Sequence, residues 1–564
     1  METSDLRHSL LDDSRNAVSH PLLKFAGKIF PVAFLLIIAG IYLYKPLYMM
    51  FGSPEYTSPH IPTEKASWLL SQLVVTMISV GLLMLAVWLV THRKAATLSA
   101  RAEKITAISV LSFFFILVFL GELSLYTDIP SYDNQMVREG ALSIMNYESI
   151  SDEVKEYIWF WPNNRGITVV LGFLGRIAGF VGVPYRLLWI AVDSSFITLS
   201  VLFAYMTVKL FCSRSVSTVI LVLISSFLLF SACSTPLANS GQDWYMLYTD
   251  SFSMPFSTIA VYCFARFFLN SDRGYKRLLL TLGGCAAVGI SSFFKPTPFI
   301  ILIAYVAVLL LHTEKRKLKE HALFVLKNAA VLVLALLITV LPFEQAYSQF
   351  EMEDSPGKQK GTYMMAHMLI LGMLNRGQDI NHNGVMVFDD PISINPFQDR
   401  GRWNYAESGF FTEDVLIARL RQQHIGMLSF YYLKDVQNLS LTYEPNVQNK
   451  LIAEQPESYY KTPFLSSWKN ALAKAQLPTR AVLWNVTFFL IGIGAYLVMK
   501  RKIKLSSAEV FLNVGMTGVL AYMTIFESGD RYAMQFWPLF LIMAGVGLMR
   551  IFGVLESCKS DTAL

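Results

Sequence analysis

The feature that most constrains this chain is a series of long apolar runs, each of a length that can cross a membrane as a helix. A hydrocarbon core about 30 Å thick takes roughly 20 apolar residues in helical form. Twelve runs meet this requirement, at residues 28–48, 67–91, 105–126, 187–211, 215–232, 252–270, 278–293, 297–312, 322–342, 481–499, 507–525 and 533–552. Charged residues make up only 16% of the chain, against about 25% in soluble proteins. The sequence therefore predicts an all-α polytopic membrane protein and excludes a soluble enzyme.

Basic residues test this topology, because loops rich in lysine and arginine stay on the cytoplasmic side. Five basic clusters fall on one side if both termini are cytoplasmic, around residues 92–104, 209–214, 266–277, 315–319 and 500–504. All five clusters lie on one side only if the apolar segment 167–184, which contains Arg176 and four glycines, does not cross the membrane. We interpret it as a juxtamembrane or re-entrant helix on the outer side, and the alternative is a thirteenth span. The net charge of +6 then reflects topology and does not indicate a nucleic-acid partner.

The polar segments divide the chain into five predicted parts. They are a cytoplasmic tail (1–27), two additional N-terminal spans (28–104), a transmembrane core (105–342) with a first outer loop at 127–186, an extracellular α-rich domain (343–480), and the last spans with a cytoplasmic tail (481–564). The segment 343–480 is too long for a simple connector, which is why we expect it to fold. The five cysteines show no CxxC pairing and predict no metal site.

The predicted first outer loop carries polar residues next to apolar spans. Asp133 stands near the start of an amphipathic helix, where a capping role is its ordinary explanation. Further along comes Trp161-Pro162-Asn163-Asn164-Arg165-Gly166. An interfacial aromatic belt explains the tryptophan. It does not explain two asparagines, an arginine and a glycine before an apolar helix, and these groups suit a sugar or a phosphate.

Three further outer segments add charges at the ends of spans. Asp250, in Tyr248-Thr249-Asp250, lies at a depth where an acid is unfavourable unless it is paired or functional. Lys295 lies in a turn, where a snorkelling lysine is the ordinary explanation. The turn 527–532 reads Glu-Ser-Gly-Asp-Arg-Tyr, an ordinary polar hairpin when taken alone. Together these segments place carboxylates and cations on one membrane face. A carboxylate can deprotonate an acceptor hydroxyl, and a cation can neutralise a phosphate leaving group.

In these motifs and their order, from about residue 120 to 550, the chain resembles the GT-C superfamily of integral membrane glycosyltransferases. Within it, the chain is similar to the multi-span members of Gram-positive bacteria. The matching elements are Asp133 to Ala141, Trp161 to Gly166, Tyr248-Thr249-Asp250, Lys295-Pro296-Thr297, His367 to Gly372, Lys434, and Glu527 to Tyr532.

The resemblance implies a GT-C-like fold of about 12 transmembrane helices, with outer juxtamembrane helices and a small extracellular α-rich domain. It implies an inverting hexosyl- or pentosyltransferase in the cell membrane, with its active site outside. The donor would be a sugar on a polyprenyl phosphate, and the acceptor an envelope glycan or glycolipid. Asp133 would be the base, and Asp250 a second acid that orients the acceptor or the base. The substrate-binding set would be Asp128, Arg138, Asn163, Asn164, Arg165, Tyr248, Lys295, His367, Glu527, Arg531 and Tyr532, with Lys295 and Arg531 as phosphate partners.

Several alternatives remain at this stage. Asp128 competes with Asp133 for the place of the base, Trp161 stands where the family pattern has tyrosine, and the first two spans have no assigned role. A divalent metal between Asp133 and Asp250 is an alternative to the metal-free mechanism, which the resemblance favours. A transporter or flippase of a lipid-linked saccharide would instead carry charges in mid-span, as Asp193 does. A non-catalytic membrane scaffold would leave the first-loop acid without a role.

Overall fold

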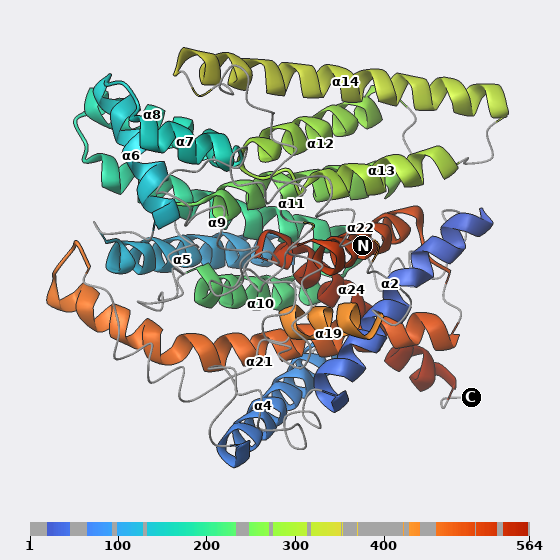
Figure 1. The fold of residues 1–564 in the computed structure, drawn as a ribbon. Helices are drawn as coiled ribbons and strands as arrows, with labels where there is room; N and C mark the ends of the chain where they lie inside the picture. The colour runs from blue at the N-terminus through green and yellow to red at the C-terminus, as the bar shows by residue number, and fades with distance from the viewer. Residues whose placement is uncertain are drawn as a thin grey trace.

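The computed structural model describes residues 18, 20–44, 65–92, 99–127, 132–232, 247–269, 274–312, 317–350, 352, 369, 421, 428–439, 458–501, 504–526 and 534–561. Almost all of these residues lie in helices, as the apolar runs predict (Figure 1). The α-helices are α2 (Pro21–Ala39), α4 (Lys65–His92), α5 (Ala100–Leu125), α6 (Tyr132–Asn146), α7 (Asp152–Phe160), α8 (Asn164–Val181), α9 (Tyr185–Phe211), α10 (Arg214–Ala232), α11 (Thr249–Leu269), α12 (Tyr275–Phe294), α13 (Phe299–Leu311), α14 (Leu318–Gln349), α19 (Leu428–Leu439), α21 (Pro463–Arg501), α22 (Ser507–Ile525) and α24 (Trp537–Asp561). A π-helical turn, η2 (Gly40–Tyr44), extends α2, and a 3-10 turn, η5 (Met534–Phe536), precedes α24.

All twelve predicted spans coincide with helices. Ten helices of the described chain are long and apolar enough to cross a membrane. Three shorter apolar helices, Leu70–Leu85, Phe299–Leu311 and Trp537–Phe552, cover three other predicted spans. The helix Asn164–Val181 is among the ten, so the segment that we expected to lie beside the membrane has the length and composition of a span.

The predicted starts differ most from the observed ones at two long helices. We expected spans to begin at residues 28 and 481, but α2 begins at Pro21 and α21 at Pro463. Proline suits the first turn of a helix, because its fixed φ is helical and the amide it lacks would have no intrahelical partner. At α21 the Thr462 hydroxyl also accepts a hydrogen bond from the amide of Leu465, at 3.2 Å. Apolar periodicity alone does not predict helix starts that depend on proline or on a capping threonine.

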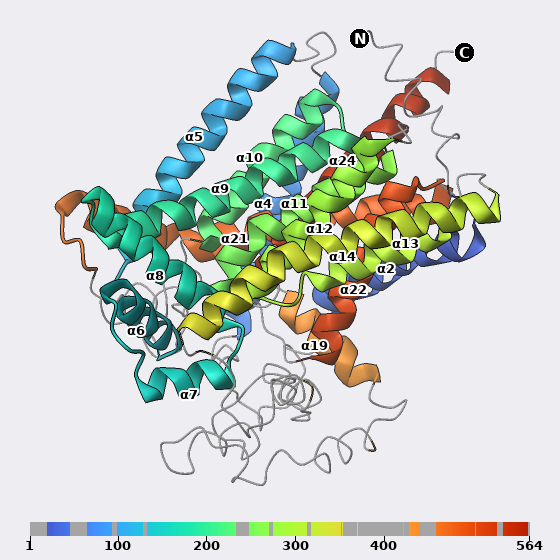
Figure 2. The ribbon, with the colours of Figure 1, turned by 90° about the horizontal axis from the view of Figure 1, so that it is seen from above.

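The helices form a bundle with two distinct ends. Figure 2 shows α6 and α7 together at one end, with α8 running at an angle to α5, α9 and α10. We call this the site end, and it also holds the turn 295–298 between α12 and α13. At the other end, Lys209 and Arg214 pair with Glu103, at 2.7 and 3.5 Å. Arg550 pairs with Glu509 near the start of α22, at 2.7 Å. We call this the basic end.

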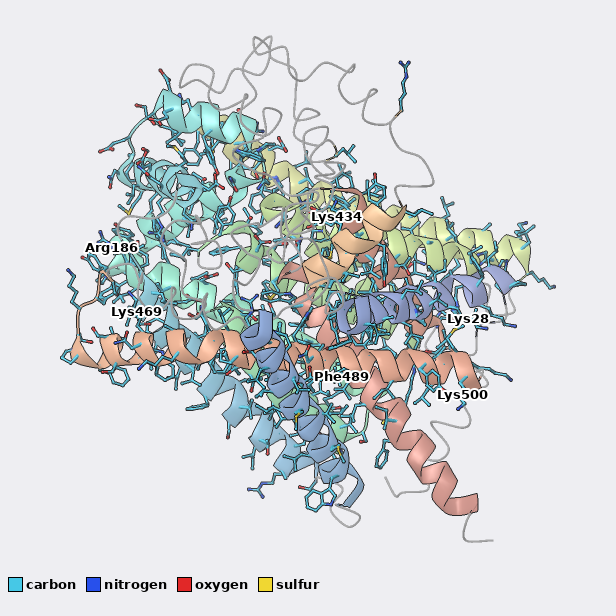
Figure 3. All side chains as sticks on the ribbon, turned by 60° about the horizontal axis from the view of Figure 1, so that its bottom comes forward. Lys28, Arg186, Lys434, Lys469, Phe489 and Lys500 are labelled. Carbon is cyan, nitrogen blue, oxygen red and sulfur yellow. The ribbon has the colours of Figure 1, made fainter. Side chains whose placement is uncertain are left out.

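Side chains far apart in the sequence confirm this division. In Figure 3, Lys28 of α2 and Lys500 of α21 lie toward one side of the molecule, and Arg186 of α9 and Lys469 of α21 toward the other. Helix α21 therefore runs the full length of the bundle. Its middle packs on α10 and α24 through an aromatic cluster in which the ring centroid of Trp484 lies 5.0 Å from that of Phe227 and 5.3 Å from that of Phe540.

Helix α19 closes part of the site end. The Lys434 side chain is fully buried and donates hydrogen bonds to the backbone carbonyls of Thr524 and Phe526, at 3.0 and 2.6 Å (Figure 3). The Thr524 hydroxyl donates to Asp435 at 2.7 Å. A cation at the C-terminus of a helix satisfies its last carbonyls and opposes its dipole. Lys434, a motif residue in the sequence, thus caps α22 in the structure.

Candidate functional site

Asp133 lies in the first turn of α6, half-buried, at the site end of the bundle. Helix α6 is held by the glycine-rich face of α8. A Cβ atom added at Gly172 would lie 2.5 Å from the Ile144 side chain, so only glycine allows this approach. Arg176 of α8 donates from Nε to the carbonyl of Ile144, at 2.7 Å, near the end of α6. The close contact of the two helices fixes where Asp133 stands.

Tyr157 connects the elements of the site, although no motif marks it in the sequence. Its side chain is fully buried on α7, and its hydroxyl is hydrogen-bonded to the Asp133 carboxylate and to Tyr248. The Asn164 amide donates to the same hydroxyl at 2.6 Å. Burial first, and then the neighbouring Asp133 and Tyr248, raise the pKa of Tyr157 well above its ordinary value. Tyr157 is therefore a neutral phenol, a form that donates a hydrogen bond to a carboxylate.

This arrangement brings together residues from four separate parts of the sequence. Asp133 comes from α6, Tyr157 from α7, Asn164 from the start of α8 and Tyr248 from the residue before α11. The sequence predicted three of these four as site residues. Tyr157 was missed because α7 is a short amphipathic helix, and no spacing rule links its hydroxyl to Asp133.

The asparagine pair is positioned by a tight turn and a close backbone contact. Asn163 donates from Nδ2 to Oδ1 of Asn164, at 3.1 Å. A Cβ atom added at Gly166 would lie 2.2 Å from the carbonyl oxygen of Phe293, near the end of α12. Glycine at 166 is therefore required for α8 to start directly against α12. Phe293 is two residues before Lys295, so this contact joins the asparagine motif to the Lys-Pro-Thr turn.

Lys295 and Asp250 form a buried ion pair between the end of α12 and the start of α11. The Lys295 ammonium donates to Oδ1 of Asp250, and the side chains are 8% and 0% exposed. Oδ2 of Asp250 accepts no hydrogen bond from the residues that the structure describes. A second contact, between the hydroxyls of Ser253 and Ser291 at 2.8 Å, ties the same two helices. Asp250 thus holds Lys295 in place, and its predicted role in orienting the acceptor or the base stays a prediction.

Two predicted substrate-binding arginines have structural contacts. Arg138 donates to the carbonyl of Thr127 at 2.7 Å, and its guanidinium lies 4.7 Å from the Tyr126 ring centroid. Arg138 thereby fixes α6 to the end of α5. Arg165 is half-buried, with its guanidinium 5.9 Å from the ring centroid of Tyr347 on α14. The predicted site residues outside the described part of the chain are Asp128, His367, Glu527, Arg531 and Tyr532.

The turn after Lys295 contacts the residues that follow the turn 527–532 in the sequence. The Thr297 hydroxyl donates to Oε1 of Gln535 at 2.5 Å, and both side chains are buried. In the described residues, no three His, Cys, Asp or Glu side chains cluster closely enough to hold a metal ion. A metal-free mechanism remains a prediction, as does the alternative of a metal between Asp133 and Asp250.

Comparison with known proteins assigns the chain to a family. Residues 24–550 match the family described as conserved hypothetical integral membrane protein, and the chain belongs to it. No curated protein matches the chain. Among solved structures, it is similar to the oligosaccharyltransferase AglB from Archaeoglobus fulgidus, solved in complex with an inhibitory peptide and a dolichol-phosphate, with 14% identity and a TM-score of 0.39. The match covers 82% of this chain and 52% of AglB, so the chain spans about half the length of that protein.

Proposed function

We propose that the protein is an inverting GT-C-type glycosyltransferase that moves a sugar from a polyprenyl-phosphate donor to an envelope glycan or glycolipid. The observation that carries this proposal is the hydrogen-bonded group of Asp133, Tyr157, Asn164 and Tyr248 at one end of a helical membrane bundle. The order of the sequence motifs, which resembles that of the GT-C superfamily, supports the reaction class.

In the proposed reaction, Asp133 removes the proton of an acceptor hydroxyl. The hydroxyl oxygen attacks the anomeric carbon from the face opposite the phosphate. The new bond forms as the bond between the anomeric carbon and the phosphate oxygen breaks, which inverts the configuration. The polyprenyl phosphate leaves with the bonding electron pair, and the proton on Asp133 passes to water. A general base of this kind contributes about 10²–10⁴-fold to the rate.

The neighbours of Asp133 suit this role. The Tyr157 hydroxyl fixes one orientation of the carboxylate, and Asn164 fixes Tyr157 in turn. We assign Lys295 and Arg531 as the partners of the leaving phosphate. In this assignment the ion pair with Asp250 sets the position of the Lys295 ammonium group, which carries three hydrogen-bond donors. A charge-assisted contact to phosphate contributes about 1.5–3 kcal/mol.

The charge distribution supports an orientation with the site end outside the cell. Lys209, Arg214 and Arg550 lie at the basic end, where they pair with Glu103 and Glu509. Cytoplasmic loops carry the excess of lysine and arginine in membrane proteins. The donor would then reach the site from the outer leaflet, with its tail among the lipid-facing helices.

A lipid-linked saccharide transporter is the second candidate, because two buried acids lie within spans. Asp193 of α9 and Glu122 of α5 are both fully buried, and they are close enough to interact electrostatically. Intramembrane acids often mark ion pathways in transporters. Substrate turnover separates the two candidates, since a transporter moves the lipid-linked sugar without breaking its bond to phosphate.

The test is a reconstituted assay with two readouts. Purified protein in lipid vesicles is supplied with polyprenyl-phosphate hexoses and pentoses, with and without glycan and glycolipid acceptors. We expect acceptor-dependent release of free polyprenyl phosphate and a product of inverted anomeric configuration. Movement of intact donor between leaflets, without release of polyprenyl phosphate, would instead support the transporter. If the protein showed neither transfer nor transport with any donor, that result would support the non-catalytic scaffold.

A further inference from the structure

The residue before Tyr248 has an unusual backbone conformation. Leu247 has a φ of 52°, in the left-handed region, and its side chain is buried. Bulky residues without special local support are rarely found there, because Cβ then crowds the backbone. Such conformations persist only where the surroundings enforce them, and they gather at functional sites. Leu247 leads directly into Tyr248 and Asp250, both of which we place in the site.

The backbone amide of Leu247 is hydrogen-bonded to a carboxylate on a different helix. Asp193 of α9 is fully buried, and its Oδ2 accepts a hydrogen bond from the backbone amide of Leu247, at 2.8 Å. The Ser251 side chain lies close to Asp193. The Ser251 hydroxyl donates to the carbonyl oxygen of Tyr248, at 3.1 Å. Asp193 therefore contacts the chain both before and after Tyr248 and Asp250.

The surroundings of Asp193 favour a positioning role. Ser194, the next residue on α9, donates to Oε2 of Glu122 at 3.1 Å, which fixes this part of α9 to α5. Because α9 is fixed to α5 at this point, the Asp193 carboxylate on α9 is a rigid attachment point for the residues that precede α11. An acid buried within a span is unfavourable unless it has a partner or a task. The amide of Leu247 is such a partner.

We propose that Asp193 is a positioning residue that holds Leu247 in its left-handed conformation and so sets Tyr248 and Asp250 in the site. Its effect on transfer rests on the proposed glycosyltransferase function, whereas its effect on the Leu247 turn does not. Through Tyr248 it supports the hydrogen bonds of Tyr157, and through Asp250 it supports the position of Lys295. The sequence marked Asp193 only as an acid in mid-span.

Three variants test this role. Asp193→Ala removes the acceptor for the Leu247 amide, and Asp193→Asn keeps an acceptor oxygen while removing the charge. Ser195→Ala is the matched control on the same helix, because the exposed Ser195 hydroxyl donates to the carbonyl of Ala191 in its own helix, at 2.6 Å. Hydrogen exchange of the peptide covering 247–252 reports on the turn, and kcat and KM for the donor report on the site.

We expect Asp193→Ala to speed exchange in this peptide and to lower kcat by about 10- to 100-fold, with little change in KM, since misplacement by about 1 Å has effects of this size. Asp193→Asn should restore most of both quantities, and Ser195→Ala should match the wild type. Unchanged exchange in Asp193→Ala would overturn the proposal. Equal defects in the Asn and Ala variants would also overturn it, because charge rather than an acceptor would then be needed. A wild type without transfer would refute the proposed function, and the exchange series would still decide the role of Asp193.

Discussion

The contact at Gly166 yields a prediction whose size follows from the geometry. Gly166→Ala puts a Cβ atom 2.2 Å from the carbonyl oxygen of Phe293 and 2.7 Å from its carbonyl carbon. Real Cβ contacts are essentially never shorter than 3.0 Å. The two backbones must therefore separate by about 1 Å, and no side-chain rotation can relieve a clash with a backbone carbonyl.

The expected loss of stability is the difference of two effects. Overpacking of this kind costs about 1–3 kcal/mol, and a backbone obstacle places it in the upper part of that range. Alanine in place of glycine favours the helix by up to about 1 kcal/mol. The net destabilisation is then about 1–2 kcal/mol. A displacement of about 1 Å at the start of α8 also moves Asn163 and Asn164, for which a loss of activity of about 100-fold is expected.

The control is Gly179→Ala on the same helix, where an added Cβ atom meets nothing within 4 Å. Thermal unfolding of the purified variants, followed by tryptophan fluorescence, should show a lower midpoint for Gly166→Ala. Gly179→Ala should unfold at the wild-type temperature or above it. Equal midpoints and equal transfer rates for the two variants would refute the claim that α8 is positioned by close contact with α12.

Three other predictions concern the charged and hydrogen-bonded groups of the site end. Asp250→Asn and Lys295→Met should each destabilise the fold by about 3–5 kcal/mol, since each leaves a buried partner uncompensated, while the double variant recovers most of the thermal midpoint. Tyr157→Phe should lower kcat about 10- to 100-fold, the equivalent of about 1.5–3 kcal/mol for a lost hydrogen bond to a carboxylate, with the donor KM unchanged in steady-state kinetics. Burial raises the pKa of Asp435 to about 7 from an ordinary 3.8. As the pH rises from about 4 to about 7, the folded state therefore keeps a proton that the unfolded chain loses. The docking of α19 is strongest below about pH 4, and its free energy weakens by at most about 4 kcal/mol as the pH rises through 7. Protection factors of 428–439 at pH 5 and 8 check this, and Asp435→Asn should remove the difference.

The helical membrane bundle was predictable because it depends on local hydrophobicity. Each predicted span needed only about 20 apolar neighbours in sequence, and each coincides with a helix. The starts of α2 and α21 were missed because they depend on proline and on a capping threonine rather than on apolar content. The segment 167–184 shows the limit of this reasoning, because its length and composition fit a span while its glycine face packs on α6.

The candidate site was predictable in part, for a different reason. Asp250 stood out because an acid at the end of a span requires a partner, and the structure pairs it with Lys295. Tyr157 carried no such signal, and Asp193 was marked only as an acid in mid-span, with no partner indicated. Their partners, Asp133 and Leu247, lie 24 and 54 residues away in the sequence, and only tertiary packing selects such partners.

The most direct test of the central claim is the rate at which Asp133→Asn releases polyprenyl phosphate from the donor in the presence of an acceptor. The matched control is Glu139→Gln, which changes an exposed carboxylate on the same helix that accepts a hydrogen bond from Gln135, at 2.8 Å. We expect a loss of about 10²–10⁴-fold for Asp133→Asn and wild-type release for Glu139→Gln, with both proteins unfolding at the wild-type temperature. Wild-type release by Asp133→Asn would contradict the role of Asp133 as the base and would direct the search for the base to Asp128.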